Sequence, residues 1–264
     1  LNRVFRSRGG LFKPSREVRA LDEVSFTLSR GETIGIVGES GSGKSTLGRC
    51  VVRLERPDSG EILLGGEDLS ALKGDALRRQ RHRVQMVFQD PYASLNPRTR
   101  VGMAIAQGPI ANGVPREKAL AKADELLELV GLGGSADRFP HEFSGGQRQR
   151  IGIARALALD PELIVADEAV SALDVSIQAQ VLELLEDLKQ RFSLSLLFIT
   201  HDLRVAAQIC DRIIVMQKGR IVEQGSAQEV FTRPQADYTR ELLAAIPGRD
   251  KTTDNKTSKE ETSV

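Results

Sequence analysis

Residues 38–45 read Gly38-Glu39-Ser40-Gly41-Ser42-Gly43-Lys44-Ser45. This order of residue types, G-x-x-x-x-G-K-[ST], is typical of a loop that holds the phosphates of a nucleotide. Its three glycines let the backbone wrap closely around a phosphate, with successive N–H groups pointing inward. We expect Lys44 to reach the β- and γ-phosphates and the Ser45 hydroxyl to hold Mg²⁺. Such a loop follows a strand and opens a helix, which predicts a buried strand over Thr33–Val37 and a helix beginning at Lys44.

The segments around this loop alternate between strand-like and helix-like patterns. Strands are predicted at Val24–Leu28, Val84–Phe88, Leu163–Ala166 and Ser195–Ile199, with a β-rich stretch up to about Leu64. Helices are predicted from Pro115 to Val130, from Ser144 to about Leu159 and from about Ser176 to Arg191. A closing hairpin is predicted from Arg212–Met216 and Arg220–Glu223. Strands that alternate with helices indicate an α/β domain with a largely parallel sheet, into which the helical middle is inserted.

The composition excludes several classes of protein. Lys and Arg number 37 against 36 Asp and Glu in 264 residues, so the chain is not a polycation built for nucleic acid. Trp is absent and aromatic residues make up 4%, which disfavours a platform for stacking bases. The two cysteines, Cys50 and Cys210, are too few for a disulfide framework and form no CxxC pair. No apolar run approaches the ~18 residues that a membrane span needs.

Both ends of the sequence are polar. The segment from Leu1 to Arg19 holds six basic residues and one acidic residue. That pattern favours a solvated hairpin over an arm that binds nucleic acid or a membrane surface. Residues 248–264 contain one apolar residue, Val264, and are predicted to form a disordered tail. The chain starts with Leu1 instead of Met, so we expect it to be trimmed or cut from a longer polypeptide.

Two acidic residues, Asp167 and Glu168, directly follow the apolar run Leu163–Ala166. A nucleotide-binding protein needs a carboxylate at such a strand end to hold Mg²⁺, and Asp167 fits that role. Glu168 is then the candidate to polarise an attacking water as general base. Taken alone, an acid pair at a strand end is more often a helix cap or a solvated turn. The complete phosphate-binding loop upstream reverses that preference.

A second glycine-rich helix start occurs at Ser144-Gly145-Gly146-Gln147. Ser144 is a good N-cap, so one interpretation is an ordinary helix start with a loose glycine hinge. The other is a second phosphate-binding helix terminus. Residue chemistry leaves both interpretations open. Because one chain needs only one phosphate cradle, a second one suggests a site that another subunit completes.

These motifs together resemble the nucleotide-binding subunit of ATP-binding cassette (ABC) transporters. The motifs occur in that family's order and approximate spacing: residues 38–45, Gln89, residues 143–147, Asp167-Glu168, Ser171-Ala172-Leu173-Asp174 and His201. The resemblance implies an α/β fold, namely a P-loop NTPase (ABC ATPase) core with a β-rich N-terminal subdomain and an inserted α-helical subdomain. It implies one nucleotide-binding domain over residues 1–247, with the helical insertion at about 92–158.

The resemblance also implies roles for individual residues, with ATP and Mg²⁺ as ligands. Implied catalytic residues are Glu168, His201 and Lys44. Implied ATP-binding residues are Phe5, Gly38, Glu39, Ser40, Gly41, Ser42, Gly43, Lys44, Ser45, Thr46 and Gln89. Implied Mg²⁺ ligands are Ser45, Gln89 and Asp167. In a head-to-tail dimer, the residues facing the opposite ATP would be Ser144, Gly145, Gly146 and Gln147, and Asp174 would lie at the dimer seam.

Several of these residues also have a plain structural interpretation. Gln89 could end a strand as a surface amide, and His201 and Asp174 could cap helices. Phe5 is the first choice for stacking on adenine and Phe12 the second, but apolar packing explains either aromatic equally well. The functional interpretation is preferred because the whole set occurs together.

Four further segments resemble one group within the family. They are residues 90–98, Pro140-His141-Glu142, residues 168–176 and residues 238–247. They are similar to bacterial importers of oligopeptides, dipeptides, glutathione and nickel. This implies an ATPase that works with a second ABC subunit (identical, different or fused), two membrane permease subunits and a periplasmic or lipoprotein solute-binding protein. It implies no direct contact with nucleic acid, and a peripheral location on the cytoplasmic face of the bacterial inner membrane.

The alternative is a soluble ABC ATPase that acts on nucleic acid or ribosomes. Such proteins usually carry coiled-coil insertions or basic arms. The basic cluster Arg78-Arg79-Gln80-Arg81-His82-Arg83 is the feature that could support it. A solvated or helix-capping face explains this cluster more simply.

Overall fold

The structure, a computed structural model, describes residues 1–7, 16–90 and 94–246. A six-stranded sheet with the order β10-β9-β3-β8-β7-β6 runs through its centre. The strands are β3 (Thr33–Val37), β6 (Val84–Val87), β7 (Leu163–Asp167), β8 (Ser195–Ile199), β9 (Arg212–Gln217) and β10 (Arg220–Ser226). Strands β9, β3, β8, β7 and β6 pair in parallel, and β10 pairs antiparallel to β9. The expected parallel α/β sheet is therefore present.

Apolar residues on both faces of the sheet explain why these strands read as continuous hydrophobic runs. Strands β3, β7 and β8 are buried at every residue. Because successive side chains point to opposite faces, Ile34 and Ile36 join one apolar cluster with Leu47. Ala166 and Phe198 join a second cluster on the other face. Parallel sheets are stable only when both faces are covered in this way.

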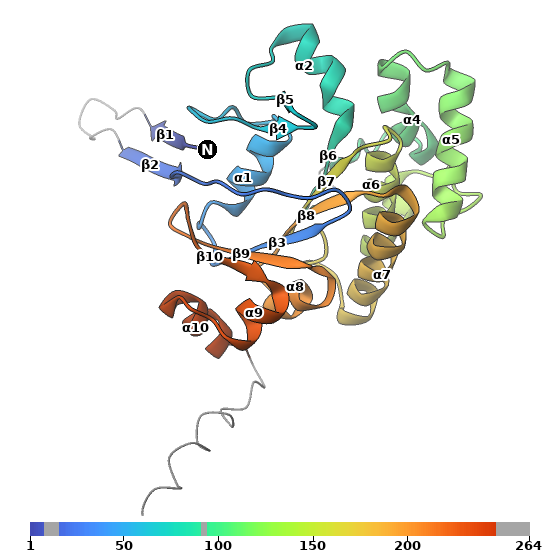
Figure 1. Cartoon of the computed structure of the whole chain (residues 1–264). Helices are drawn as coiled ribbons and strands as arrows, with labels where there is room; N and C mark the ends of the chain where they lie inside the picture. The colour runs from blue at the N-terminus through green and yellow to red at the C-terminus, as the bar shows by residue number, and fades with distance from the viewer. Residues whose placement is uncertain (8–15, 91–93, 247–264) are drawn as a thin grey trace, which may run out of the picture.

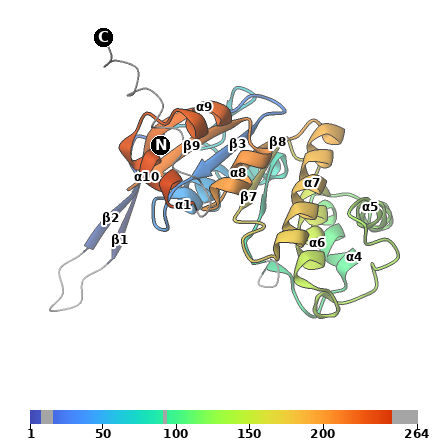
Figure 2. The ribbon, with the colours of Figure 1, turned by 90° about the horizontal axis from the view of Figure 1, so that it is seen from below.

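The structure also contains α-helices, most of which cover the two faces of the sheet. They are α1 (Lys44–Val51), α2 (Gly74–Gln80), α4 (Val101–Ala111), α5 (Arg116–Leu129), α6 (Gly145–Leu157), α7 (Val175–Phe192), α8 (Leu203–Ile209), α9 (Ala227–Thr232) and α10 (Asp237–Ala244), with the 3₁₀ turns η1 (Arg81–Arg83) and η2 (Pro140–Glu142). Helix α1 contributes to the cluster that contains Ile34, and α4 to α9 contribute to the cluster that contains Phe198. Helices α4, α5 and α6 pack together at the end of the sheet nearest β6 (Figure 1). Figure 2 shows α6 between α4 and α7.

Two small hairpins lie outside the main sheet. Strands β1 (Arg3–Ser7) and β2 (Arg16–Leu21) form the expected N-terminal hairpin, which projects from the body of the protein in Figure 2. Strands β4 (Leu63–Leu64) and β5 (Glu67–Asp68) form the other. The β-rich stretch expected up to Leu64 is wrong for the most part, because helix α1 and connecting segments occupy most of it.

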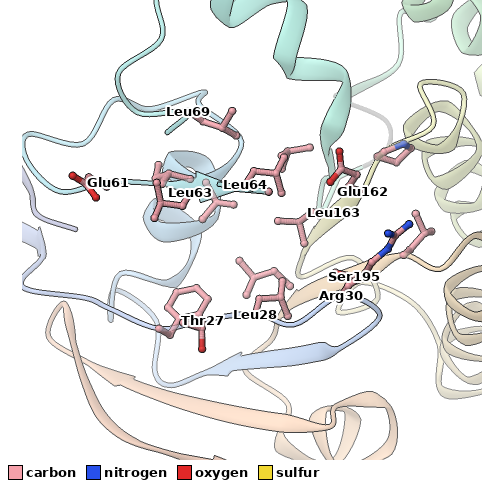
Figure 3. Close-up of a pocket in the computed structure, with 18 of the residues that line it drawn as sticks. Thr27, Leu28, Arg30, Glu61, Leu63, Leu64, Leu69, Glu162, Leu163 and Ser195 are labelled. Carbon is pink, nitrogen blue, oxygen red and sulfur yellow. The ribbon is translucent and has the colours of Figure 1, made fainter. Parts of the chain in front are cut away.

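The strand predicted at Val24–Leu28 is also wrong. These residues have no strand assignment and line a cavity of about 1140 Å³ instead. Figure 3 shows Thr27 and Leu28 on one side of this cavity and Leu63 and Leu64 on the other. Leu163 and Ser195, the first residues of β7 and β8, also line it, so it lies at the amino end of the parallel strands. The polar–apolar alternation of Val24–Leu28 reflects burial of one side of this segment, but no neighbouring strand pairs with it.

Most other sequence expectations match the structure. The strands at Thr33–Val37 and Ser195–Ile199 are confirmed to the residue, and the closing hairpin is confirmed as β9 and β10. The three expected helices are confirmed as α5, α6 and α7, with ends that differ by one or two residues. The predicted tail, residues 248–264, lies outside the described residues. In the described part of the chain, no helix is long and apolar enough to cross a membrane.

Candidate functional site

The glycine-rich loop 38–45 joins β3 to α1 at the carboxyl end of the sheet. Gly38 has φ 143° and Gly43 has φ 106°, values that side chains other than glycine rarely adopt. A Cβ atom on Gly38 would lie 2.2 Å from the Met216 carbonyl oxygen, and one on Gly43 would lie 2.3 Å from the Ala20 carbonyl oxygen. The loop is thus seated against β9 and β2, and glycine is required at both contacts.

Lys44 lies folded back over this loop. Its Nζ donates hydrogen bonds to the carbonyl oxygens of Gly38 and Glu39, each at 2.8 Å. Burial lowers the pKa of Lys44, and the negative charges of Glu168 and Asp167 oppose that shift. The ammonium group is therefore held by its own loop, next to two carboxylates and at the wall of a cavity.

Ser45 and Asp167 meet directly. The Ser45 hydroxyl donates to Asp167 Oδ1 at 2.9 Å, which joins the loop to the end of strand β7. Burial raises the pKa of Asp167, while the Ser45 hydrogen bond and the charges of Arg49 and Lys44 oppose the rise. Mg²⁺ prefers hard oxygen ligands such as a hydroxyl and a carboxylate. The Ser45 hydroxyl and the Asp167 carboxylate lie next to each other, so they fit the ion that the sequence predicts.

Two further polar residues of the predicted site, Gln89 and His201, lie next to the Glu168 carboxylate. Its Oε2 accepts a hydrogen bond from Gln89 Nε2 at 3.1 Å and lies 3.4 Å from His201 Nδ1. Gln89 Nε2 also lies within hydrogen-bond distance of the Ser171 hydroxyl, at 3.4 Å. Gln89 makes no hydrogen bond to Ser45 or Asp167, and its amide contacts the candidate base Glu168 and Ser171.

The backbone of Glu168 is unusual. Its φ is 48°, in the left-handed region, and its N–H donates to the Ile199 carbonyl oxygen at 2.9 Å. The Ser171 hydroxyl donates to the Glu168 carbonyl oxygen, also at 2.9 Å. A non-glycine residue in this conformation persists only where its surroundings hold it, and such residues cluster at functional sites.

A cavity of about 490 Å³ opens over the loop. Residues that line it include, from the predicted set, Phe5, Ser40, Gly41, Gly43, Lys44, Ser45, Thr46 and Glu168. Phe5 belongs to β1, is 39% exposed, and has the Arg3 guanidinium 4.7 Å from its ring centroid. An aromatic ring beside a phosphate-binding loop suits the base of a nucleotide. Phe12, the second choice, lies outside the described residues.

Four residues that line this cavity were missed by sequence reasoning: Val18, Arg19, Ala20 and Lys218. They come from strand β2 and from the turn between β9 and β10, and they belong to no motif. The N–H of Gly219 donates to the Ser42 carbonyl oxygen at 2.9 Å, which fixes this turn against the loop. The sequence predicts a turn at Lys218-Gly219, but it does not indicate that this turn lies against the phosphate-binding loop.

The second glycine-rich segment lies apart from this cavity. Ser144 caps α6, since its hydroxyl accepts from the Gln147 N–H at 3.3 Å and Gln147 Oε1 accepts from the Ser144 N–H at 2.9 Å. Ser144, Gly145 and Gln147 are exposed, whereas Gly146 is buried against Ile177. None of these four residues lines the cavity over residues 38–45. Both sequence interpretations are compatible with an exposed, capped helix start.

Neither Asp174 nor His201 caps a helix with its side chain, which was the structural interpretation of both residues. Asp174 occupies the N-cap position of α7 but its side chain makes no capping hydrogen bond. It is exposed, and the next residue, Val175, is 83% exposed. Asp202 caps α8 by accepting from the Arg204 N–H at 2.9 Å, which leaves His201 beside Glu168.

Comparison with known proteins shows one consistent similarity. The family described as ABC transporter matches residues 21–171. A putative peptide import ATP-binding protein of Brucella ovis is 54% identical over 238 residues, which cover 89% of this chain and 75% of that protein. The oligopeptide transport ATP-binding protein AppF of Bacillus subtilis is 52% identical over 252 residues, which cover 94% and 76%.

A solved structure shares the fold. It is the dimeric structure of a post-hydrolysis state of the ATP-binding cassette MJ0796 bound to ADP and Pi. The TM-score is 0.74 at 29% identity, over 85% of this chain and 96% of that one.

Proposed function

The chain belongs to the ABC transporter family, and from that premise we propose that it binds and hydrolyses ATP to drive a bacterial importer of peptides or a related small solute, such as glutathione or a nickel complex. The chain is an ABC-type ATPase by its family and its structural relatives. The peptide substrate class is supported by the printed names of the similar proteins. The single structural observation that carries the proposal is the 2.9 Å hydrogen bond from Ser45 to Asp167. It brings the phosphate-binding loop and the acidic strand end together at one cavity.

The residues around that cavity suggest a division of roles. Lys44 and the N–H groups of residues 38–45 would bind the phosphates of ATP. Ser45 and Asp167 would hold Mg²⁺, with Gln89 as a further candidate ligand. Bound Mg²⁺ would supply charge neutralisation at the phosphate oxygens.

Glu168 would act on water at its carboxylate Oε2. That oxygen already faces Gln89 and His201, so both side chains would orient the carboxylate and the water. A general base in such a position contributes about 10²- to 10⁴-fold to a reaction rate. The left-handed backbone of Glu168 and its bond to Ile199 would keep the carboxylate in place.

The exposed start of α6 supports a site shared between two subunits. Ser144 caps the 13-residue helix α6, and Gly145, Gly146 and Gln147 begin it, outside the cavity of their own chain. A second ABC subunit, identical or different, would present the same segment to the ATP of this chain. Exposed Asp174 and Val175 would lie at that seam. Such a dimer closes when ATP bridges it and opens after the γ-phosphate is released.

Transport would require further partners. We propose two membrane permease subunits and a periplasmic or lipoprotein solute-binding protein, with this chain on the cytoplasmic face of the inner membrane. Residues 1–247 would act as one nucleotide-binding domain, and the packing of α4, α5 and α6 beside β6 supports a helical insertion at about 92–158.

The basic cluster 78–83 gives no support to a nucleic-acid function. Arg83 pairs with Glu67 and Glu162. Arg78 and Arg81 donate to the carbonyl oxygens of Ala111 and Arg53. These side chains contact this chain's own groups, as the structural interpretation expects.

The test is Lys44→Ala, with Lys118→Ala on the exposed face of α5 as the matched control. Equilibrium binding of MgATP and release of inorganic phosphate are measured on the full chain. Lys44→Ala is expected to weaken ATP binding at least about tenfold, because a buried charge-assisted contact to phosphate is lost. Lys118→Ala is expected to match the wild type. Unchanged ATP affinity in Lys44→Ala would overturn the assignment of the loop.

A further inference from the structure

Tyr238 contacts the phosphate-binding loop from a helix near the end of the chain. Its hydroxyl oxygen accepts a hydrogen bond from the Glu39 N–H at 3.0 Å. Tyr238 lies in the first turn of α10 and is only 8% exposed. It is 199 residues from Glu39 and outside the segment 21–171 that matches the family.

This bond fixes the orientation of one peptide unit of the loop. The Gly38 carbonyl and the Glu39 N–H belong to the same peptide, and in a trans peptide they point in opposite directions. The structure has no cis peptide bond among the described residues. With its N–H on Tyr238, the peptide directs its carbonyl oxygen toward Lys44 Nζ, 2.8 Å away. Tyr238 and Lys44 therefore hold opposite ends of one peptide.

The neighbouring atoms of Glu39 are held as well. Its carbonyl oxygen accepts from the Ser42 N–H at 3.2 Å and from Lys44 Nζ at 2.8 Å. Of the two backbone hydrogen-bonding groups of Glu39, the N–H is the one whose partner lies outside the loop. Without the Tyr238 hydroxyl, this N–H loses its recorded acceptor, and a peptide rotation would move the Gly38 carbonyl away from Lys44.

Helix α10 is itself anchored, so it can act as a fixed support. The Glu223 carboxylate on β10 accepts from the N–H groups of Gln235 and Ala236, at 2.8 and 3.0 Å, just before the helix begins. Leu243 at the other end of α10 is buried in the cluster that contains Phe198. The ring of Tyr238 belongs to the same cluster.

We infer that Tyr238 is a positioning residue for ATP binding: its hydroxyl orients the 38–39 peptide so that the loop and Lys44 are arranged before the nucleotide arrives. The inference rests on the proposed function, because it concerns the same ATP site. A bond that supports the loop equally in the bound and reacting states contributes uniform binding. Its loss raises KM for ATP and leaves kcat unchanged.

The test is Tyr238→Phe in the full chain, which removes the hydroxyl and keeps the ring. The matched control is Arg240→Gln in the same helical turn. Arg240 donates to the carbonyl oxygens of Pro234 and Gln235 and makes no recorded contact with the loop. Equilibrium MgATP binding, KM and kcat for phosphate release, and the melting temperature without nucleotide are measured for each protein.

Tyr238→Phe is expected to raise the Kd and KM for ATP about three- to tenfold, with kcat at saturating ATP within about twofold of wild type. Arg240→Gln is expected to keep the wild-type Kd even if its melting temperature falls. Wild-type Kd in Tyr238→Phe would overturn the inference. An equal rise in Kd in both variants would also overturn it, because general loosening of α10 would then explain the effect. A wild-type protein that binds no ATP would overturn the proposed function as well, so the two failures are distinguishable.

Discussion

Replacing Gly43 with alanine tests the seating of the phosphate-binding loop without reference to its ligand. Gly43 has φ 106°, and a Cβ atom there would lie 2.3 Å from the Ala20 carbonyl oxygen of β2. A left-handed backbone costs an L-residue about 1–2 kcal/mol. The contact adds about 1–3 kcal/mol, because a backbone atom has to move by nearly an ångström. Gly43→Ala should therefore destabilise the nucleotide-free protein by about 2–5 kcal/mol.

Gly41 provides the matched control within the same loop. It has φ 80°, but a Cβ atom on it would meet no atom within 4 Å apart from those of Gly41 and its two chain neighbours. Gly41→Ala should therefore carry the backbone strain alone, about 1–2 kcal/mol. The difference between the two variants isolates the contact with Ala20.

Urea unfolding of the nucleotide-free proteins, followed by circular dichroism, measures both free energies. The slope of the transition should be the same in all three proteins, so that midpoint shifts report stability. Gly43→Ala is expected to be less stable than Gly41→Ala by at least about 1 kcal/mol, which for a protein of this size lowers the melting temperature by roughly 2–4 °C. If Gly41→Ala proves as unstable as Gly43→Ala, or more so, the reasoning from the Ala20 contact is refuted.

Three further outcomes are expected. Glu168→Gln should lower the rate of ATP hydrolysis about 10²- to 10⁴-fold in a phosphate-release assay and leave MgATP affinity near wild type; full turnover would remove Glu168 from its role. Ser144→Arg should abolish hydrolysis while a lone chain keeps its MgATP affinity in a binding titration, and a fully active variant would contradict the shared site. Burial raises the pKa of Glu223, but the hydrogen bonds from the N–H groups of Gln235 and Ala236, together with the charge of Arg240, oppose the rise, and the pKa lies below 4.5. The Glu223 carboxylate therefore contributes stability above about pH 4.5, and this contribution is lost as the pH falls through the lower pKa of the folded state. Glu223→Gln should reduce the melting temperature at pH 7, and the difference in melting temperature from wild type should shrink on acidification. A difference that widens on acidification would contradict this.

The sheet could be predicted because its strands are buried on both faces. Continuous apolar runs such as Thr33–Val37 and Ser195–Ile199 carry that signal directly. Val24–Leu28 alternates like a strand but lacks a partner, and alternation reports burial, not pairing. Helix α4 was missed because Val101–Ala111 is apolar nearly all round and contains Pro109, so it has no polar stripe.

The short helices could not be predicted for a different reason. Helices α8, α9 and α10 span seven, six and eight residues, which is too short for a helical period to stand out. Their positions depend on burial against the sheet, and that information lies in distant parts of the chain.

The candidate site was predictable wherever a motif fixes the local backbone. The loop 38–45 and the pair Asp167-Glu168 have spacing that follows from a strand end, so their meeting in space could be expected. Tyr238 was noticed only as part of a segment shared with related importers, with no role attached. Its contact with Glu39 arises from tertiary packing across most of the chain.

At Glu168, the residue that catalysis requires is not the residue that the backbone conformation favours. Glycine or asparagine would adopt its φ of 48° with less strain, by about 1–2 kcal/mol for glycine. Neither can accept a proton as a carboxylate does. In a lineage released from the need to consume ATP, drift toward glycine or asparagine at this position should yield a sturdier, inert protein. The acid therefore persists only under continued selection for turnover.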